Sequence, residues 1–202
     1  ADADHGAPYT KGFQTCDVGR QNVVRAVDWN NDGKTDLLAG NETGTIYFYR
    51  NLTDELFPVF APGQVVLTKL GSAPRTNVCD WNNDGKKDLI VANMGGELKL
   101  FLNEGTDAEP RFGSGERVEA NGKPIDGTHW GNVLVCDWDN DGRKDVIFGM
   151  AGEGNKSEYY DWPHRDEKDP SLDKGFLFYK NVGTDAGPRL AAPKWIEAGG
   201  KP

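Results

Sequence analysis

A ten-residue acidic stretch occurs three times in this chain, and its spacing strongly constrains the possible fold. It reads DWNNDGKTDL at residues 28–37, DWNNDGKKDL at 80–89 and DWDNDGRKDV at 137–146. The starts of the three copies are separated by 52 and 57 residues, which is too regular for a chance turn. Self-similarity at a fixed period of this size is the signature of a repeat architecture. The sequence therefore predicts an array of units, each about fifty residues long.

Each unit contains four short apolar runs that are separated by Gly, Asn, Asp or Pro. In the first unit these runs cover residues 22–27, 36–40, 45–51 and 57–67, and the later units follow the same order. The runs are rich in β-branched and aromatic residues and show no sustained helical period, which is typical of β-strands. Four strands in a unit of this length are the plan of a β-propeller blade. We therefore expect an all-β chain built from blades of four antiparallel strands.

The expected organisation is a single repeat domain over residues 1–202 with three full blades. Their approximate limits are 20–70, 71–124 and 128–202, and residues 1–19 form a leading strand or tail. Closed propellers have four to eight blades, so three blades predict an open or partial propeller. Open strand edges invite pairing with another chain. The chain is expected to be part of a larger propeller or to be completed by further copies of itself, and head-to-tail contacts that do not close would give a filament.

The acidic stretches carry oxygen ligands at alternating positions, which is the pattern of a calcium-binding loop. Calcium prefers six to eight hard oxygen ligands, and the side chains at positions 1, 3, 5 and 9, together with the backbone carbonyl at position 7, supply them. The glycine at position 6 allows the sharp turn that such a loop requires. The candidate ligands are Asp28, Asn30, Asp32, Lys34 (carbonyl) and Asp36; Asp80, Asn82, Asp84, Lys86 (carbonyl) and Asp88; and Asp137, Asp139, Asp141, Arg143 (carbonyl) and Asp145.

Other interpretations of the loops fit less well. An EF-hand needs Glu at position 12 and helical flanks, whereas this chain has Ala39, Val91 and Phe148 at that position and strand-like flanks. Mg²⁺ demands stricter geometry and keeps its waters. A turn without a metal would crowd three or four carboxylates together, so the ions are expected to be structural. We predict three Ca²⁺ sites, and we expect the third, which has four carboxylates, to bind tightest.

The loop pattern D-x-[DN]-x-D-G-x-x-D between strands resembles the FG-GAP or VCBS repeat family. The resemblance covers residues ~20–202, and the literal Phe-Gly pair of the family name occurs at Phe148–Gly149. Blades of this family form integrin α-subunit heads and occur in many secreted bacterial proteins. The resemblance implies calcium-binding propeller blades and a secreted, extracellular or cell-surface location.

Charge and hydrophobicity exclude several partners. The formal net charge is −9, whereas nucleic-acid binding needs clustered Lys and Arg. Ten of the 32 acidic residues lie in the three loops, so much of the acidity belongs to the expected metal sites. No run approaches the ~18 apolar residues of a membrane span. We therefore expect no nucleic-acid partner and no membrane span.

Residues that could bind a ligand collect at the end of the blades opposite the calcium loops. One connection there, residues 151–175, is far longer than its counterparts, and long loops in compact domains are usually functional or disordered. Aromatic rings beside polar groups suit stacking on sugars, and the alternative is a lid that packs on its own blade. The candidate ligand-binding residues are His129, Trp130, Asn132, Tyr159, Tyr160, Trp162, His164 and Arg165.

The expected function is that of an extracellular calcium-stabilised module that binds a glycan or protein ligand. One alternative is a structural subunit of an extracellular assembly or filament. Another is a polysaccharide lyase, in which Tyr or His is the base and Arg neutralises a uronate. No GxSxG or HExxH motif is present in the sequence, so catalysis is the less favoured interpretation. Three N-x-S/T triplets, at Asn41, Asn51 and Asn155, are possible glycosylation sites.

Overall fold

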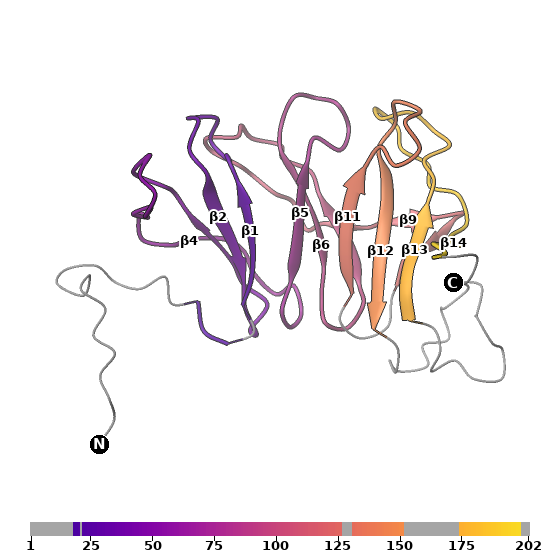
Figure 1. Ribbon diagram of the computed structural model, residues 1–202, viewed down its shortest axis with the longest axis horizontal. Coiled ribbons are helices and arrows are strands. Elements are labelled where there is room, and N and C mark those ends of the chain that lie inside the picture. Colours follow the sequence, from indigo (N-terminus) through magenta and orange to yellow (C-terminus); the bar gives the residue numbers. More distant parts are fainter. Residues whose placement is uncertain (1–17, 21, 127–130, 152–173, 199–202) are drawn as a thin grey trace, which may run out of the picture.

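The computed structural model describes residues 18–20, 22–126, 131–151 and 174–198 (Figure 1). Every regular element within these ranges is a β-strand, and none of the described residues is helical. The predicted leading strand at residues 1–19 lies almost entirely outside the described residues. The single-domain division and the blade limits remain predictions.

Three four-stranded antiparallel sheets make up most of the structure. The first contains β1 (Val23–Val27), β2 (Asp36–Gly40), β3 (Ile46–Tyr49) and β4 (Gln64–Leu67); the second contains β5 (Arg75–Cys79), β6 (Asp88–Ala92), β7 (Leu98–Phe101) and β8 (Glu116–Arg117). The third contains β11 (Asn132–Cys136), β12 (Asp145–Ala151), β13 (Lys174–Tyr179) and β14 (Lys194–Trp195), and a small hairpin pairs β9 (Glu119–Ala120) with β10 (Lys123–Pro124). The all-β prediction with four antiparallel strands in each blade is thus confirmed.

The three sheets stand side by side in chain order, and in the described part of the chain they do not close into a ring (Figure 1). The apolar core lies between neighbouring sheets. Trp29 and Leu38 of the first repeat share a buried cluster with Leu89 and Phe101 of the second. All five residues of β6 are buried, because one face of this strand packs against the first sheet and the other packs against the third.

The first strands of neighbouring sheets are tied together by arginine side chains. The Arg25 side chain, on β1, donates a hydrogen bond from Nε to the Thr76 carbonyl at 3.0 Å. The Arg75 side chain, on β5, donates to the Gly131 carbonyl at 3.3 Å. Both bonds end on backbone oxygens, so they fix one sheet against the next without requiring a particular side chain there.

A second tie between sheets forms at the end that carries the acidic loops, and we call it the inter-sheet latch. In the contact between the first and second sheets, Lys87 donates from Nζ to Asp107 at 3.0 Å and also to the side-chain oxygen of Asn31. Asn31 returns a bond from Nδ2 to Asp107 at 2.8 Å. The second repeat thus supplies the Lys87–Asp107 ion pair, and both members of this pair hydrogen-bond the Asn31 amide of the first repeat.

The latch recurs with the same geometry between the second and third sheets. Lys144 donates to Asp185 at 3.1 Å and also to the side-chain oxygen of Asn83, while Asn83 donates to Asp185 at 3.3 Å. In both latches the backbone N–H of the lysine donates to the other oxygen of the aspartate at 2.8 Å. The two latches therefore place equivalent residues of successive repeats in equivalent roles.

The latch asparagine stands at position 4 of the acidic loop in a left-handed backbone conformation. The φ angles of Asn31 and Asn83 are 60° and 57°. Asn is one of the few residues other than Gly that occupy this region readily. The latch lysine stands at position 8, where the first loop has Thr35 instead. The first repeat therefore lacks the lysine of a latch.

Replacement of Lys144 by Thr, the residue found at this position in the first loop, tests the latch. Lys144→Thr leaves the partly buried Asp185 without its cation, so we expect the free energy of unfolding to fall by about 1–2 kcal/mol in urea denaturation with calcium present. Lys194→Thr is the matched control, because Lys194 is an exposed strand residue and such changes usually cost less than about 0.5 kcal/mol. Equal losses in the two variants would show that the latch contributes nothing to stability.

Candidate metal sites

Each acidic loop joins the first strand of a sheet to the second, and the carboxylate at position 1 closes it. The Asp28 carboxylate accepts bonds from the backbone N–H groups of Asp32 and Gly33 at 3.1 and 3.0 Å. The Asp80 and Asp137 carboxylates accept from the equivalent N–H groups at 2.8–3.0 Å. The three loops therefore share one backbone conformation as well as one sequence pattern.

A glycine at position 6 is required by the backbone of these loops. Gly33, Gly85 and Gly142 each have a φ of 85°, and a Cβ at any of them would meet open space. Conformation and not crowding therefore selects glycine, because L-residues with side chains avoid this region.

The aspartate at position 9 is fully buried in all three loops, with no exposed surface at Asp36, Asp88 or Asp145. Asp36 accepts backbone N–H bonds from Trp29 at 3.0 Å and from Asn51 at 2.8 Å. These bonds join the start of the loop to the residues after the third strand. The equivalent bonds are 2.8 and 2.7 Å at Asp88 and 3.1 and 2.8 Å at Asp145. Sequence reasoning assigned these residues only to a metal, and the structure gives them a structural function as well.

The aspartate at position 5 is held in its ionised form by groups of its own loop. The Lys34 backbone N–H and the Asn30 amide lower the pKa of Asp32. Burial pushes the pKa of Asp84 upward, but hydrogen bonds from Lys86 and Asn82 outweigh it, so that pKa also lies below its ordinary value. Ionised oxygens are the form that a calcium ion needs.

The buried carboxylate at position 9 of the second loop has its pKa shifted in the opposite direction. Burial raises the pKa of Asp88, although the backbone N–H groups of Asn103 and Trp81 oppose that shift. A divalent cation in the loop would favour the ionised form of this group, because an opposite charge within a few ångströms lowers a carboxyl pKa.

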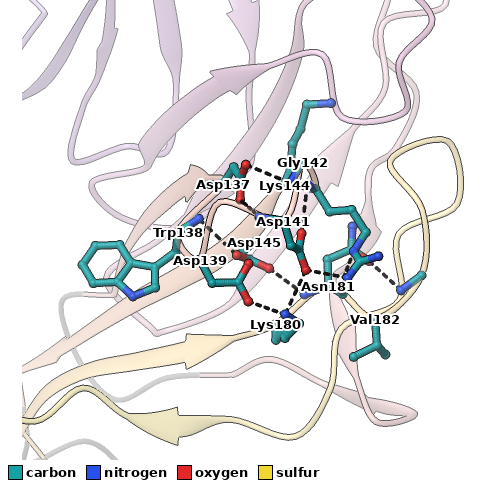
Figure 2. A network of polar contacts seen from close by, with 12 residues as sticks. Asp137, Trp138, Asp139, Asp141, Gly142, Lys144, Asp145, Lys180, Asn181 and Val182 are labelled. Atoms are coloured by element: carbon teal, nitrogen blue, oxygen red, sulfur yellow. Dashed lines mark hydrogen bonds and ion pairs between the residues drawn. The ribbon is translucent and has the colours of Figure 1, made fainter.

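The third loop gathers carboxylates most closely (Figure 2). Oxygens of Asp137, Asp139 and Asp145 all lie within 4.8 Å of one another. Asp141, also a predicted ligand, lies outside this group and pairs with Arg143 and with Lys180, the latter at 2.8 Å. The ammonium group of Lys180 is the main reason that the pKa of Asp141 is lowered.

Lys180 also contacts Asp139, the carboxylate that distinguishes the third loop from the other two. Its equivalents in the first and second repeats are Arg50 and Leu102. The fourth carboxylate of the third loop is thus accompanied by a cation that the second repeat lacks. The prediction that the third site binds tightest stays a prediction, and this ion pair weakens the argument for it.

The donor set of the loops fits calcium. Each loop offers carboxylate or amide oxygens at positions 1, 3, 5 and 9, and the hydrogen bonds above hold these side chains within one short turn. Oxygen-only sites of this kind suit hard cations, and flexible geometry favours Ca²⁺ over Mg²⁺. All fifteen predicted metal-site residues lie in the described part of the chain, in three separate loops.

Most of the predicted ligand-binding residues lie outside the described part of the chain. Asn132 is exposed at the start of β11. The other seven lie outside the described residues: His129, Trp130, Tyr159, Tyr160, Trp162, His164 and Arg165. In that part of the chain the ligand-binding prediction stays a prediction.

Two of the three possible glycosylation sites are buried. Asn51 donates from Nδ2 to the Thr35 carbonyl at 3.1 Å, and Asn41 accepts from the backbone N–H groups of Thr43 and Thr45. Their burial argues against glycan attachment in the folded chain. Asn155 lies outside the described residues.

Sequence reasoning missed the latch residues Asn31, Asn83, Lys87, Lys144, Asp107 and Asp185. A signal for them was present, because the second and third loops share Lys at position 8 and the turns at 105–108 and 183–186 both read GTDA. Both features are missing from the first repeat. Their joint occurrence was a clue that they interact.

Comparison with known proteins agrees with this geometry. Residues 80–148 match the family model described as FG-GAP-like repeat. The matched range contains the second and third acidic loops. It is 27% identical over 146 residues to Cartilage acidic protein 1 of Xenopus tropicalis, which covers 71% of this chain and 22% of that protein. It is 27% identical over 114 residues to Cartilage acidic protein 1 of Homo sapiens, with 56% and 17% covered. The chain thus spans about a fifth of the length of these relatives.

A separate finding concerns membranes. Among the described residues, no helix is long and apolar enough to cross one.

Two alanine substitutions in the third loop separate the structural aspartate from an exposed one. Asp145→Ala leaves the buried N–H of Asn181 and the part-buried N–H of Trp138 without an acceptor, so we expect a loss of about 2–5 kcal/mol in urea denaturation with EDTA present. Asp139→Ala removes an exposed carboxylate and is expected to cost less than about 1 kcal/mol under the same conditions. A similar loss in both variants would refute the structural role of the buried carboxylate.

Proposed function

We propose that this chain is an extracellular repeat module whose blades are stabilised by calcium. One observation supports the proposal above the others: the same acidic loop, closed by the same backbone hydrogen bonds, occurs between the first two strands of all three sheets. A solvated turn needs neither the acidic residues at alternating positions nor their repetition.

Calcium at these loops would act as a staple within each sheet. The loop joins the first strand to the second, and its last aspartate binds the backbone that follows the third strand. An ion coordinated by that loop would neutralise its carboxylates and so restrain three of the four strands together. Three divalent ions would also offset most of the net charge of −9.

The relatives that match this chain support an extracellular setting. The relatives that match this chain are named for cartilage, and the chain is similar to them over more than half of its length. Extracellular calcium modules bind with dissociation constants of about 10⁻⁴–10⁻³ M, and we expect this range for the present loops.

We further propose that glycan or protein ligands bind at the end opposite the acidic loops. The loops share their end of each sheet with the turns between third and fourth strands, as the bonds that the Asn51 and Asn103 N–H groups donate to Asp36 and Asp88 require. That end is occupied by repeated, structural residues. The opposite end carries Asn132 and the non-repeated connections, which are the better place for specific recognition.

Removal of calcium is the direct test of the proposed function. With dissociation constants of about 0.1 mM, 1 mM calcium stabilises the chain by roughly 1.4 kcal/mol at each site. Three sites would then raise the melting temperature by about 8–16 °C for a chain of this size. We expect a fall of that order when EDTA is added, measured by differential scanning calorimetry.

Magnesium at the same concentration is the control for a general effect of charge screening. It should restore less than half of the lost melting temperature, because Mg²⁺ keeps its waters and demands octahedral geometry. An unchanged melting temperature in EDTA, with no calcium found by elemental analysis, would refute the proposal.

Replacement of Lys180 by Leu, the residue at this position in the second repeat, tests the charge balance of the third loop. Lys180→Leu removes the ammonium group that competes with calcium for Asp139 and Asp141, so we expect the calcium affinity of this loop to rise about 2- to 5-fold. Isothermal titration calorimetry would measure it in a background carrying Asp32→Ala and Asp84→Ala. Lys194→Leu is the control and should leave the affinity unchanged, and an unchanged affinity in Lys180→Leu itself would contradict the prediction.

A further inference from the structure

The tryptophan at position 2 of the acidic loop has three very different exposures in the three repeats. Trp29 is 2% exposed, Trp81 is 6% exposed and Trp138 is 51% exposed. Trp29 packs edge-on against Phe112 of the second repeat, with ring centroids 6.2 Å apart. Trp81 lies in one buried cluster with Leu190 of the third repeat, which occupies the same place as Phe112. Each buried tryptophan is therefore covered by the repeat that follows it.

Trp138 lies in the loop between β11 and β12, and its indole ring points away from the polar network of that loop (Figure 2). It differs from Trp29 and Trp81 in its surroundings and not in its loop, because its backbone N–H makes the same bond to the buried aspartate at position 9. The exposed indole therefore lacks the apolar side chain of a following repeat that covers the tryptophan in each of the two preceding repeats.

The third repeat also presents the asparagine of a latch, but not the lysine and aspartate that a following repeat would supply. Asn140 has a φ of 58°, which is the conformation of the latch residues Asn31 and Asn83. Those two residues each bond a lysine and an aspartate of the next repeat, whereas Asn140 makes no side-chain hydrogen bond to any residue that the structure describes. The surface thus offers an amide in the position that a latch would use.

We propose that the edge formed by Trp138 and Asn140 is a docking surface for a further blade of the same repeat type. Three features define the blade that fits. It carries Lys at position 8 of its acidic loop, Asp in its turn between third and fourth strands, and a bulky apolar residue where the second repeat has Phe112. The two interfaces already present in the chain supply this pattern twice, so the proposal extends an observed contact by one repeat.

The first sheet of a second copy does not fit this surface. It offers Phe60 at the place of Phe112, so the apolar contact could form. However, it has Thr35 at position 8 and Glu55 at the place of Asp107, and Thr35 cannot donate as an ammonium group does. Head-to-tail pairing of copies would therefore lack the latch, and the preferred occupant is a different blade.

The experiment uses the full chain with a second copy of residues 71–124 joined after Pro202. The added blade brings the lysine, aspartate and phenylalanine of the second repeat to the exposed edge. A matched variant carries Lys87→Thr and Asp107→Ala in the added blade only. The probe is 5-fluorotryptophan, whose Trp138 signal in ¹⁹F NMR is assigned by Trp138→Phe, and its exposure is measured by broadening from a soluble gadolinium chelate.

In the unextended chain we expect Trp138 to be broadened strongly at every protein concentration. The added blade should reduce this broadening several-fold, to near that of Trp29, and the matched variant should lose most of the protection. Hydrogen exchange of the added copy of β6 shows whether the added blade has folded.

Three results would overturn the proposal. The first is a folded added blade that leaves Trp138 exposed. The second is equal protection by the matched variant, which would mean that the latch residues do not select the occupant. The third is protection of Trp138 in the unextended chain as its concentration rises, with dimers in sedimentation, which would make a second copy the occupant.

Discussion

The structure depends on a carboxylate that is buried in every repeat. Asp36, Asp88 and Asp145 have no exposed surface, and each accepts two backbone N–H bonds from different segments of its repeat. An ionised group in such a place is costly unless it is fully hydrogen-bonded or paired with a cation. The two N–H groups supply the hydrogen bonds, and a calcium ion in the adjoining loop would supply the cation. Through the position of the loop, a bound ion would therefore be coupled to the folding of three strands.

The same ten residues also set the contacts between repeats. Position 2 places a tryptophan against the next sheet, position 4 turns an asparagine toward it, and position 8 supplies the lysine that meets the preceding asparagine. A single loop thus acts within its sheet through Asp residues and between sheets through Trp, Asn and Lys. A change in loop conformation, for example after the loss of a bound ion, would therefore alter the contacts within the sheet and also those between neighbouring sheets.

The sequence was sufficient to predict the strands, because repetition and apolar periodicity are local properties that survive in every copy. The repeated acidic loops were predictable for the same reason, and their assignment as calcium ligands stays a prediction. The latch was not, since Asn31 and Asp107 are 76 residues apart and only the three-dimensional stacking of sheets brings them together. The pairing of Lys180 with Asp139 was missed similarly, because the count of carboxylates in a loop says nothing about a cation that arrives from another strand. Sequence reasoning therefore failed where contacts cross between segments.

Trp138 shows how position in an array can override residue identity. Its loop has the sequence pattern and the hydrogen bonds of the other two, yet its indole is exposed because burial of this residue is a property of the next repeat. In repeat proteins the stability is approximately a sum of terms within repeats and terms between neighbours, and terminal repeats need a polar outer face to remain soluble. The third sheet shows an exposed indole beside an amide that bonds no side chain in the described part of the chain. The contacts that Trp138 and Asn140 would make with another blade are those seen at the two interfaces between the described sheets. A blade that docks there therefore needs no new kind of contact, only the lysine and aspartate that the first repeat lacks.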